Sequence, residues 1–250
     1  MEFDQHVPFF RAFGQQLVDW AQVGSGHHVL DVGVGRGANL FPAAARVGPS
    51  GRVVGIDAAA GMITGTTHAI RAEGLTHAQV ALMDAACLDF PDCTFDRVLS
   101  GFTLHMLPDP TTTLSEIYRV LNPGGIVALS LPGPHPDRRW DRYGELIGQY
   151  VADVDRARWP DWPAHDWSQL LGEAGFTHGD MVNRAVEIPL ESPESFWRGE
   201  MAHGMRGFIE ALPPTSRAAF QDDVLGWLRN MEPLTLSRGA WFYKAEKLLA

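Results

Sequence analysis

A glycine-rich turn separates a short apolar segment from a helical pattern near the start of the chain. Residues 29–32 (Val-Leu-Asp-Val) read as a buried strand that carries one acid, Asp31. Gly33, Gly35 and Gly37 follow, and apolar residues then recur with helical spacing over residues 40–47. Glycines remove the β-carbons where a ligand would approach the backbone, and the helix start offers unpaired N–H groups. The combination predicts a cradle for a nucleotide-type ligand.

The kind of nucleotide is not decided by the glycines alone. Residues 33–38 (Gly-Val-Gly-Arg-Gly-Ala) also fit the dinucleotide-binding pattern with alanine in the last place. Asp31 bears on the choice, because a carboxylate there would repel a pyrophosphate but would suit a ligand with a cationic amino group. A glycine turn needed only for tight packing is the alternative without a ligand.

This stretch resembles motif I of the class I S-adenosylmethionine (SAM) methyltransferases. The resemblance implies that Asp31 helps to hold the methionine end of SAM, while Gly33, Gly35 and Gly37 let the backbone close on it. Residues 52–57 (Arg-Val-Val-Gly-Ile-Asp) read as the second parallel strand. Asp57 then lies at its carboxyl end beside the glycine turn, where it would accept both ribose hydroxyls. NAD enzymes use the same device, so Asp57 does not separate the two cofactors.

Two further strands carry acids. Residues 78–85 predict a third strand that ends in Asp84 and Ala85, and residues 95–101 predict a fourth that opens with Asp96. An acid followed by a small residue resembles the methyltransferase motif that hydrogen-bonds the adenine amino group. Asp96 is as well explained by a structural role as by a direct one. The cofactor contacts that we expect in addition are Ala58, Met62 and Ser100.

A helix ending at Asn122-Pro123-Gly124-Gly125, followed by a strand over 126–131, completes the likeness, which covers residues 29 to 131. Four motifs arrive in order, which makes the resemblance specific. It implies an α/β fold: a Rossmann-like doubly wound, mainly parallel seven-stranded sheet with an antiparallel last strand and a helical cap. We expect a helix with Asp166 as its N-cap, a sixth strand over 181–190, and a last strand over 240–245.

The length favours a single domain over residues 1–250. Its core would comprise residues 25–131, 164–191 and 236–250. The segments 1–22, 133–163 and 192–235 are surplus and would form lid and cap; Ser192-Pro193 opens a helix in the last of them. The second and third segments hold five of the eight tryptophans. The helix that carries Phe10, Phe13 and Leu17 would pack on the sheet, or its outer end with Phe3, Phe9 and Phe10 would fold over the ligand. A satellite core or a homodimer contact is the alternative role of the aromatic segments.

Net charge and cysteine content bear on the partners, compartment and metal content that we expect of the protein. The net charge is −10 and the pI about 5.4, so the long-range field opposes nucleic acids and anionic membranes. Without a signal-peptide pattern at the start, we expect a cytoplasmic protein. Cys87 and Cys93 are too few for a disulfide framework, and no histidine pair has metal-ligand spacing. A metal is not expected.

The expected reaction is transfer of a methyl group from SAM, with S-adenosylhomocysteine as product, to a small, largely apolar acceptor. The resemblance points to the quinone-biosynthesis and natural-product branch of the family. O-methylation is favoured, with C- or N-methylation as alternatives. A general base would help a hydroxyl acceptor, and His105, beyond the fourth strand, and His135, after the fifth, are the candidates. The rival functions are a SAM-binding protein without methyl transfer and an NAD(P)-dependent oxidoreductase.

Overall fold

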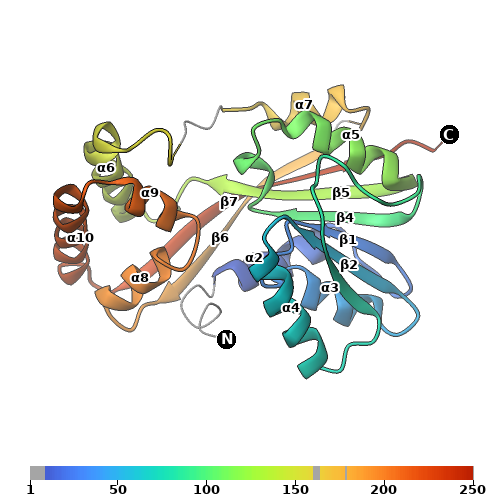
Figure 1. The fold of residues 1–250 in the computed structure, drawn as a ribbon, viewed down its shortest axis with the longest axis horizontal. Helices are drawn as coiled ribbons and strands as arrows, with labels where there is room; N and C mark the ends of the chain where they lie inside the picture. Colours follow the sequence, from blue (N-terminus) through green and yellow to red (C-terminus); the bar gives the residue numbers. More distant parts are fainter. Residues whose placement is uncertain (1–8, 160–163, 178, 250) are drawn as a thin grey trace. The chain divides into compact units, whose positions relative to one another are not determined.

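The computed structural model describes residues 9–159, 164–177 and 179–249, which fold into two compact units (Figure 1). Of the described residues, the sheet unit comprises 10–132, 164–177, 179–184 and 240–249, and the helical unit comprises residue 9, 133–159 and 185–239. Phe3 and Trp162, which the sequence places in a lid and a cap, lie outside the described residues. Each unit is considered by itself below.

A seven-stranded sheet with the order β3-β2-β1-β4-β5-β7-β6 organises the sheet unit. Buried, β-branched segments form its centre, where Leu30 pairs with Val54 on one side and with Val98 on the other, both in parallel register. The strands are β1 (His28–Val32), β2 (Arg52–Asp57), β3 (Ala78–Leu82), β4 (Phe95–Gly101), β5 (Leu121–Gly133), β6 (Asp180–Pro189) and β7 (Thr235–Glu246).

The last strands run antiparallel, as predicted. Thr177 donates its backbone N–H to the carbonyl of Glu246, while Asn183 donates its side-chain amide to the carbonyl of Ala240. As the residue number increases from 177 to 183, the number of the bonded residue decreases from 246 to 240, so the two segments run antiparallel. The order of the parallel strands reverses between β1 and β4, so this is the doubly wound, Rossmann-like α/β fold expected from the sequence.

Three strand boundaries differ from the prediction by three residues or more, while β1 and β6 differ by one residue. The third strand was predicted to reach Ala85, but β3 ends at Leu82 because Asp84 accepts a hydrogen bond from the N–H of Ala86 and closes a turn. β5 begins at Leu121, which pairs with Phe95 beside a register shift, instead of after the glycines. β7 begins at Thr235 instead of residue 240.

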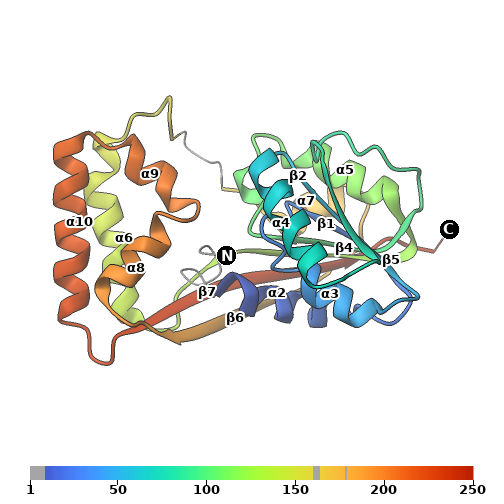
Figure 2. The same ribbon diagram turned by 60° about the horizontal axis from the view of Figure 1, so that its bottom comes forward.

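Helices cover both faces of the sheet. One face carries α2 (Phe9–Trp20), α3 (Leu40–Val47) and α4 (Ala60–Ala72), and the other carries α5 (Pro110–Val120) and α7 (Trp167–Glu173) (Figures 1 and 2). The carboxylate of Asp166 caps α7 by accepting from the N–H of Gln169, as predicted. A short 3₁₀ turn, η1 (Leu104–Met106), follows β4. The core lies between these helices and the central strands.

Packed helices and aromatic rings form the helical unit. Its elements are η2 (Arg138–Trp140), α6 (Asp141–Tyr150), η3 (Val151–Asp153), α8 (Pro193–Glu200), α9 (Met205–Ala211) and α10 (Pro214–Arg229). Ser192 and Ser195 form a capping box that starts α8, as the Ser-Pro pair predicted. The fully buried ring of Trp140 lies 5.0 Å from Trp227 and 5.2 Å from Phe196, centroid to centroid. The rings thus give this unit an interior of its own.

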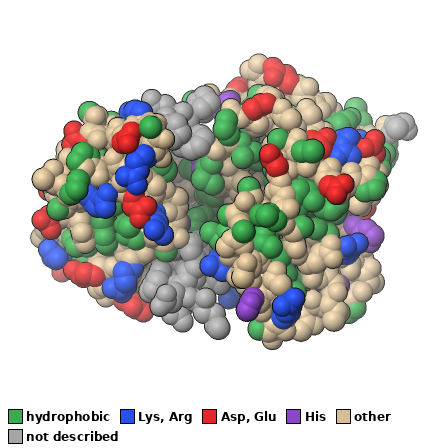
Figure 3. Space-filling model, viewed as in Figure 1, with side chains coloured by type: hydrophobic (Ala, Val, Ile, Leu, Met, Phe, Trp, Pro, Cys, Tyr) green, Lys and Arg blue, Asp and Glu red, His purple; other side chains and the backbone are tan. Residues whose placement is uncertain are grey.

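The surface of the helical unit is mixed in charge: on the face shown, basic and acidic side chains are interspersed (Figure 3).

Cys87 and Cys93 are both free and exposed. Across the described ranges, no helix has the length and apolar character needed to cross a bilayer.

Candidate functional site

The glycine turn between β1 and α3 has a left-handed backbone at all three predicted positions. The φ angles of Gly33, Gly35 and Gly37 are +74°, +51° and +85°. A β-carbon on Gly33 would lie 2.2 Å from the side chain of Thr103, and one on Gly37 would lie 2.5 Å from the ring of Phe41. At Gly35 the nearest atom, the carbonyl oxygen of Gly33, is 4.0 Å away. Gly35 is therefore the glycine with open space above it, where a ligand can approach the backbone.

The acid at the end of β2 lies against this turn. One carboxylate oxygen of Asp57 accepts from the N–H of Gly35 over 2.9 Å, and the other accepts from the N–H of Ala59 over 2.8 Å. Asp57 is half-buried and each oxygen keeps a free lone pair, so it can still accept hydroxyl groups. Ala58 is exposed beside it, and Met62 is half-buried in the first turn of α4.

The next predicted acid is linked to the same edge of the sheet. The N–H of Met83 donates to the carbonyl of Asp57, which holds the end of β3 beside β2. Asp84 follows in the turn with an exposed side chain, and Ala85 is half-buried. The structure thus brings Gly35, Asp57 and Asp84 together at the carboxyl edge of three neighbouring strands.

Asp31 differs from the other acids because it is fully buried. One carboxylate oxygen accepts from the amide of Asn39 over 2.9 Å, and the other has no hydrogen-bond partner among the described residues. Burial raises the pKa of Asp31 to about 7, against the hydrogen bond from Asn39, and the nearby charge of Asp57 raises it further. The unpartnered oxygen is of the kind that a cationic amino group satisfies.

The carboxyl end of β4 meets the glycine turn. Ser100 is buried and donates its hydroxyl to the carbonyl of Val32, so its hydrogen is engaged within the sheet. The hydroxyl of Thr103 lies 3.1 Å from the carbonyl oxygen of Gly101 and 3.4 Å from that of Gly33. Thr103 therefore ties β4 to the turn, a role for which its place in the sequence gives no signal.

His105 lies in η1, two residues beyond Thr103. Its side chain is half-buried, and its Nδ1 has no hydrogen-bond partner among the described residues. Burial lowers the pKa of His105 to about 4. The ring is therefore neutral at physiological pH, and its lone pair is free to accept a proton, but the lowered pKa makes it a weaker base than an exposed imidazole.

His135 belongs to the helical unit. Its Nδ1 lies 2.8 Å from the carbonyl oxygen of Ser237. Because a carbonyl only accepts, this contact places the proton on Nδ1 and leaves the Nε2 lone pair available. Burial and the charge of Arg238 lower the pKa of His135. It too is a neutral imidazole with one nitrogen ready to accept a proton.

A buried ionic network in the helical unit was not predicted. Glu200, 2% exposed, accepts from Arg238 over 2.8 Å, from His203 over 3.2 Å and from the hydroxyl of Tyr143. Burial opposes its ionisation, but the charge of Arg238 and these hydrogen bonds prevail and lower the pKa of Glu200 to about 2. Since 38 residues separate Glu200 from Arg238, no local spacing in the sequence pairs them.

Asp96, by contrast, has a structural role at the amino end of β4. Its carboxylate accepts from the N–H of His28 over 2.8 Å and from the amide of Asn122 over 2.9 Å. These bonds join the starts of β1, β4 and β5. The structural explanation of Asp96 is the one that its contacts support.

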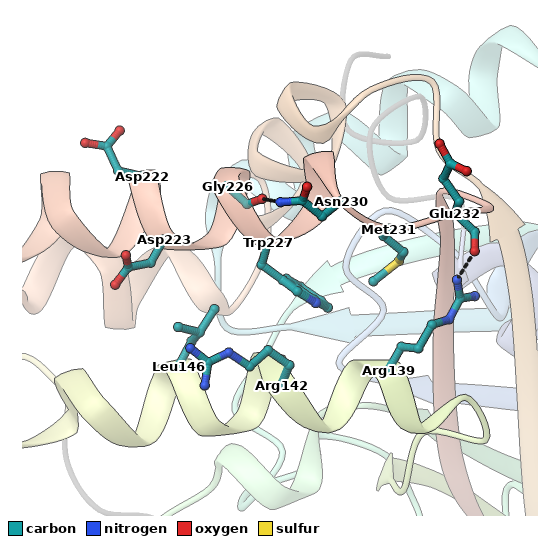
Figure 4. A pocket seen from close by; sticks show the side chains of 10 residues that line it. All are labelled: Arg139, Arg142, Leu146, Asp222, Asp223, Gly226, Trp227, Asn230, Met231 and Glu232. Atoms are coloured by element: carbon teal, nitrogen blue, oxygen red, sulfur yellow. Dashed lines mark hydrogen bonds between the residues drawn. The ribbon is translucent and has the colours of Figure 1, made fainter.

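An open pocket of about 770 Å³ lies between α6 and α10 in the helical unit (Figure 4). Its polar side chains are largely bonded to their own surroundings: Arg139 donates to the carbonyl of Glu232, and Asn230 donates to that of Gly226. None of the predicted site residues lines this pocket. It therefore does not compete with the edge of the sheet as the candidate site.

The glycine turn and its acids fit SAM. Gly35 leaves room for a ligand against the backbone, Asp57 can accept ribose hydroxyls, and the buried oxygen of Asp31 lacks a partner that an amino group would supply. Among the described residues, no group of three His, Cys, Asp or Glu side chains could hold a metal ion.

Comparison with known proteins agrees with this geometry. A family model described as a methyltransferase domain matches residues 29–125. Nocamycin O-methyltransferase from Saccharothrix syringae is 33% identical over 234 residues, which cover 88% of this chain and 84% of that protein. Aklanonic acid methyltransferase DauC from Streptomyces sp. is 40% identical over 126 residues, which cover 50% of this chain and 57% of that protein. The chain thus spans little more than half the length of the second relative.

Solved structures show the same fold at lower identity. The YcgJ protein of Bacillus subtilis superposes with a TM-score of 0.64 and 16% identity, covering 96% of this chain and 100% of that one. The [4+2]-cyclase SpnF gives a TM-score of 0.61 and 20% identity, covering 96% of this chain and 82% of that one.

Proposed function

Because the chain belongs to the class I SAM-dependent methyltransferase family and uses SAM to methylate small molecules, we propose that it transfers the methyl group to an oxygen of a largely apolar acceptor. The observation that carries the proposal is the set of Gly35, Asp57 and Asp84 at one edge of the sheet, together with 33% identity to an O-methyltransferase over nearly the whole chain.

The cofactor contacts follow from the polarity of this edge. The backbone at Gly33, Gly35 and Gly37 faces the methionine portion, and Asp31 takes its amino group. Asp57 accepts the ribose hydroxyls. The remaining proposed contacts surround the adenine and the methionine chain: Ala58, Met62, Asp84, Ala85 and Ser100. SAM, when bound, supplies an electrophilic methyl group, so the protein must orient an acceptor and exclude water.

Two neutral histidines are available to take a proton from an oxygen or acidic-carbon acceptor. A hydroxyl must lose its proton during transfer, and a neutral imidazole can take it. His105 is our first candidate, since it follows the turn that touches Gly33. His135 is the second, since its tautomer leaves Nε2 free to accept. An amine acceptor would need no such base, and an acidic carbon would use the same one.

The helical unit is the proposed cap of a single methyltransferase domain. Its segments 133–163 and 192–235 are those that the sequence marks as surplus to the core. The buried rings of Trp140 and Phe196, together with the half-buried ring of Trp227, give it an aromatic interior of its own. A largely apolar acceptor suits a cap rich in aromatic residues.

The test is a product search with isotope-labelled SAM. Purified protein is incubated with labelled SAM and a mixture of phenols, enols, carboxylic acids and amines, and products are identified by mass spectrometry and NMR. The proposal expects label in a methoxy or methyl-ester group. Label confined to nitrogen or carbon would overturn O-methylation while leaving methyl transfer in place. SAM binding without any labelled product from the mixture or from a cell extract would favour the non-methylating alternative, since the fold alone also occurs in a [4+2]-cyclase.

A further inference from the structure

The first residue after β4 has an unusual backbone. Phe102 has a φ of +52°, in the left-handed region that side chains larger than glycine seldom adopt. Three non-glycine residues have a positive φ within the described chain, and Phe102 is the aromatic one among them. Strained backbone of this kind persists only where the surroundings enforce it, and it is concentrated at functional sites.

Two rings from the first described helix surround Phe102. Phe10 contacts it edge-on, with centroids 5.5 Å apart, and Phe13 contacts it at 5.3 Å. Both belong to α2, and Phe13 is itself buried in the core. The N–H of Phe102 donates to the carbonyl of Ser130 in β5 over 2.8 Å. The ring of Phe102 therefore packs against α2, while its backbone N–H is bonded to β5.

The conformation of Phe102 decides where its neighbours lie. Immediately after it, the side chain of Thr103 fills the space that a β-carbon on Gly33 would need. His105 follows in η1 with one buried, unpartnered nitrogen. A change of backbone at Phe102 would move Thr103 away from the glycine turn and would move His105 with it.

We propose that Phe102 is a positioning residue for methyl transfer: clamped by Phe10 and Phe13 of α2, it seats Thr103 on Gly33 and sets the place of His105. The helix α2 thereby serves the reaction through Phe102 in addition to covering the sheet. The inference rests on the proposed function, because it presumes that the glycine turn holds SAM and that His105 faces the acceptor.

Substitutions at Phe102 separate its ring from its backbone. Phe102→Tyr keeps the ring, Phe102→Ala removes it and leaves the strained φ, and Phe102→Gly removes it but accepts that φ without strain. Phe90→Ala is the matched control, since Phe90 is also half-buried and also makes an edge-on ring contact, with Phe95, at 5.1 Å. Phe10→Leu weakens the clamp from α2 without altering the turn itself.

The readouts are the affinity for S-adenosylhomocysteine by calorimetry, kcat with labelled SAM, and the NMR titration of the His105 ring. We expect Phe102→Ala to weaken affinity about tenfold and lower kcat further, Phe102→Gly to lie between it and wild type, and Phe102→Tyr to stay within twofold of wild type. Phe10→Leu should shift both quantities in the same direction by about threefold. In Phe102→Ala the titration midpoint of His105 should rise from about 4 toward its ordinary value near 6.5.

A role in general packing alone predicts a different pattern. Phe90→Ala and Phe102→Ala would then lose stability alike, with affinity, kcat and the His105 midpoint unchanged in both, and that result would overturn the inference. Should Phe102→Ala fail to fold, wild-type values in Phe10→Leu would overturn it instead. Failure of the wild-type protein to bind S-adenosylhomocysteine would count against the proposed function, which that measurement tests separately.

Discussion

The carboxylate of Asp57 accepts a 2.9 Å hydrogen bond from the backbone N–H of Gly35, so the acid at the end of β2 also holds the middle glycine of the turn. This bond fixes the distance between the proposed ribose acceptor and the open backbone position. A single hydrogen bond thus links the carboxylate that would accept the ribose hydroxyls to the glycine that leaves room for the ligand.

Asp57→Ala should weaken SAM binding by roughly 1.5 to 3 kcal/mol, the usual effect of losing hydrogen bonds to a charged acceptor, because both the ribose contact and the support of Gly35 disappear. Calorimetry with S-adenosylhomocysteine measures it. Asp96→Asn is the control, since Asp96 joins β1, β4 and β5 at their amino ends and should leave the affinity unchanged. A loss of less than twofold in Asp57→Ala would show that Asp57 is not the ribose acceptor.

Gly35→Val should abolish measurable SAM binding, and Gly35→Ala should weaken it strongly, while the protein stays folded. The space above Gly35 is open, so a β-carbon there meets the ligand before it meets the protein. Gly48→Ala is the matched control: its φ is +65° and nothing lies within 4 Å of the added carbon. The two variants should lose similar stability in urea, and equal SAM affinity in both would place the ligand elsewhere.

The affinity for SAM should rise with pH if Asp31 takes the amino group. Burial raises its pKa to about 7, so the carboxyl is protonated below that pH and the cationic ligand must expel the proton. Between pH 5.5 and 7, below the ordinary α-amino pKa of about 7.7–8.0, affinity should increase about tenfold. Asp31→Asn should remove this dependence. Constant wild-type affinity across the window would exclude Asp31 from the site.

His105→Ala should lower the rate by about 10²–10⁴-fold with SAM affinity within a few fold of wild type, because proton removal matters only in the transition state. Since burial lowers the pKa of His105 to about 4, the wild-type rate should be level above about pH 5 and fall only below it. His68→Ala, an exposed histidine on α4, is the control. Near-normal turnover in His105→Ala would shift the role of base to His135.

Much of the sheet unit was predictable because its signals are local. β2 and β4 agree with the sequence to the residue, since buried apolar runs bounded by turn residues leave little choice of boundary. The same reasoning failed at β3, where the carboxylate of Asp84 accepts from the N–H of Ala86 and the strand ends early. The pattern that marks an acid as a ligand contact does not reveal that it also closes a turn.

The less predictable features depend on contacts between distant residues. The pairing of Glu200 with Arg238, and the place of Thr103 over Gly33, have no spacing that a sequence reveals. The left-handed backbone of Phe102 could not be predicted either, because phenylalanine seldom adopts a positive φ. The ring contacts that enforce this conformation come from a distant helix. The candidate cofactor residues were thus accessible from sequence, while those that position them were not.

The most direct test of a SAM site at the glycine turn is a calorimetric titration of the wild-type protein with S-adenosylhomocysteine, and separately with NAD and NADP. We predict one site with a dissociation constant on the order of micromolar for S-adenosylhomocysteine, and no heat of binding from either dinucleotide at tenfold higher concentration. Asp31 and Asp84 suit an amino acid and an adenine amino group, not a pyrophosphate. Binding of NAD or NADP in preference to S-adenosylhomocysteine would contradict the account.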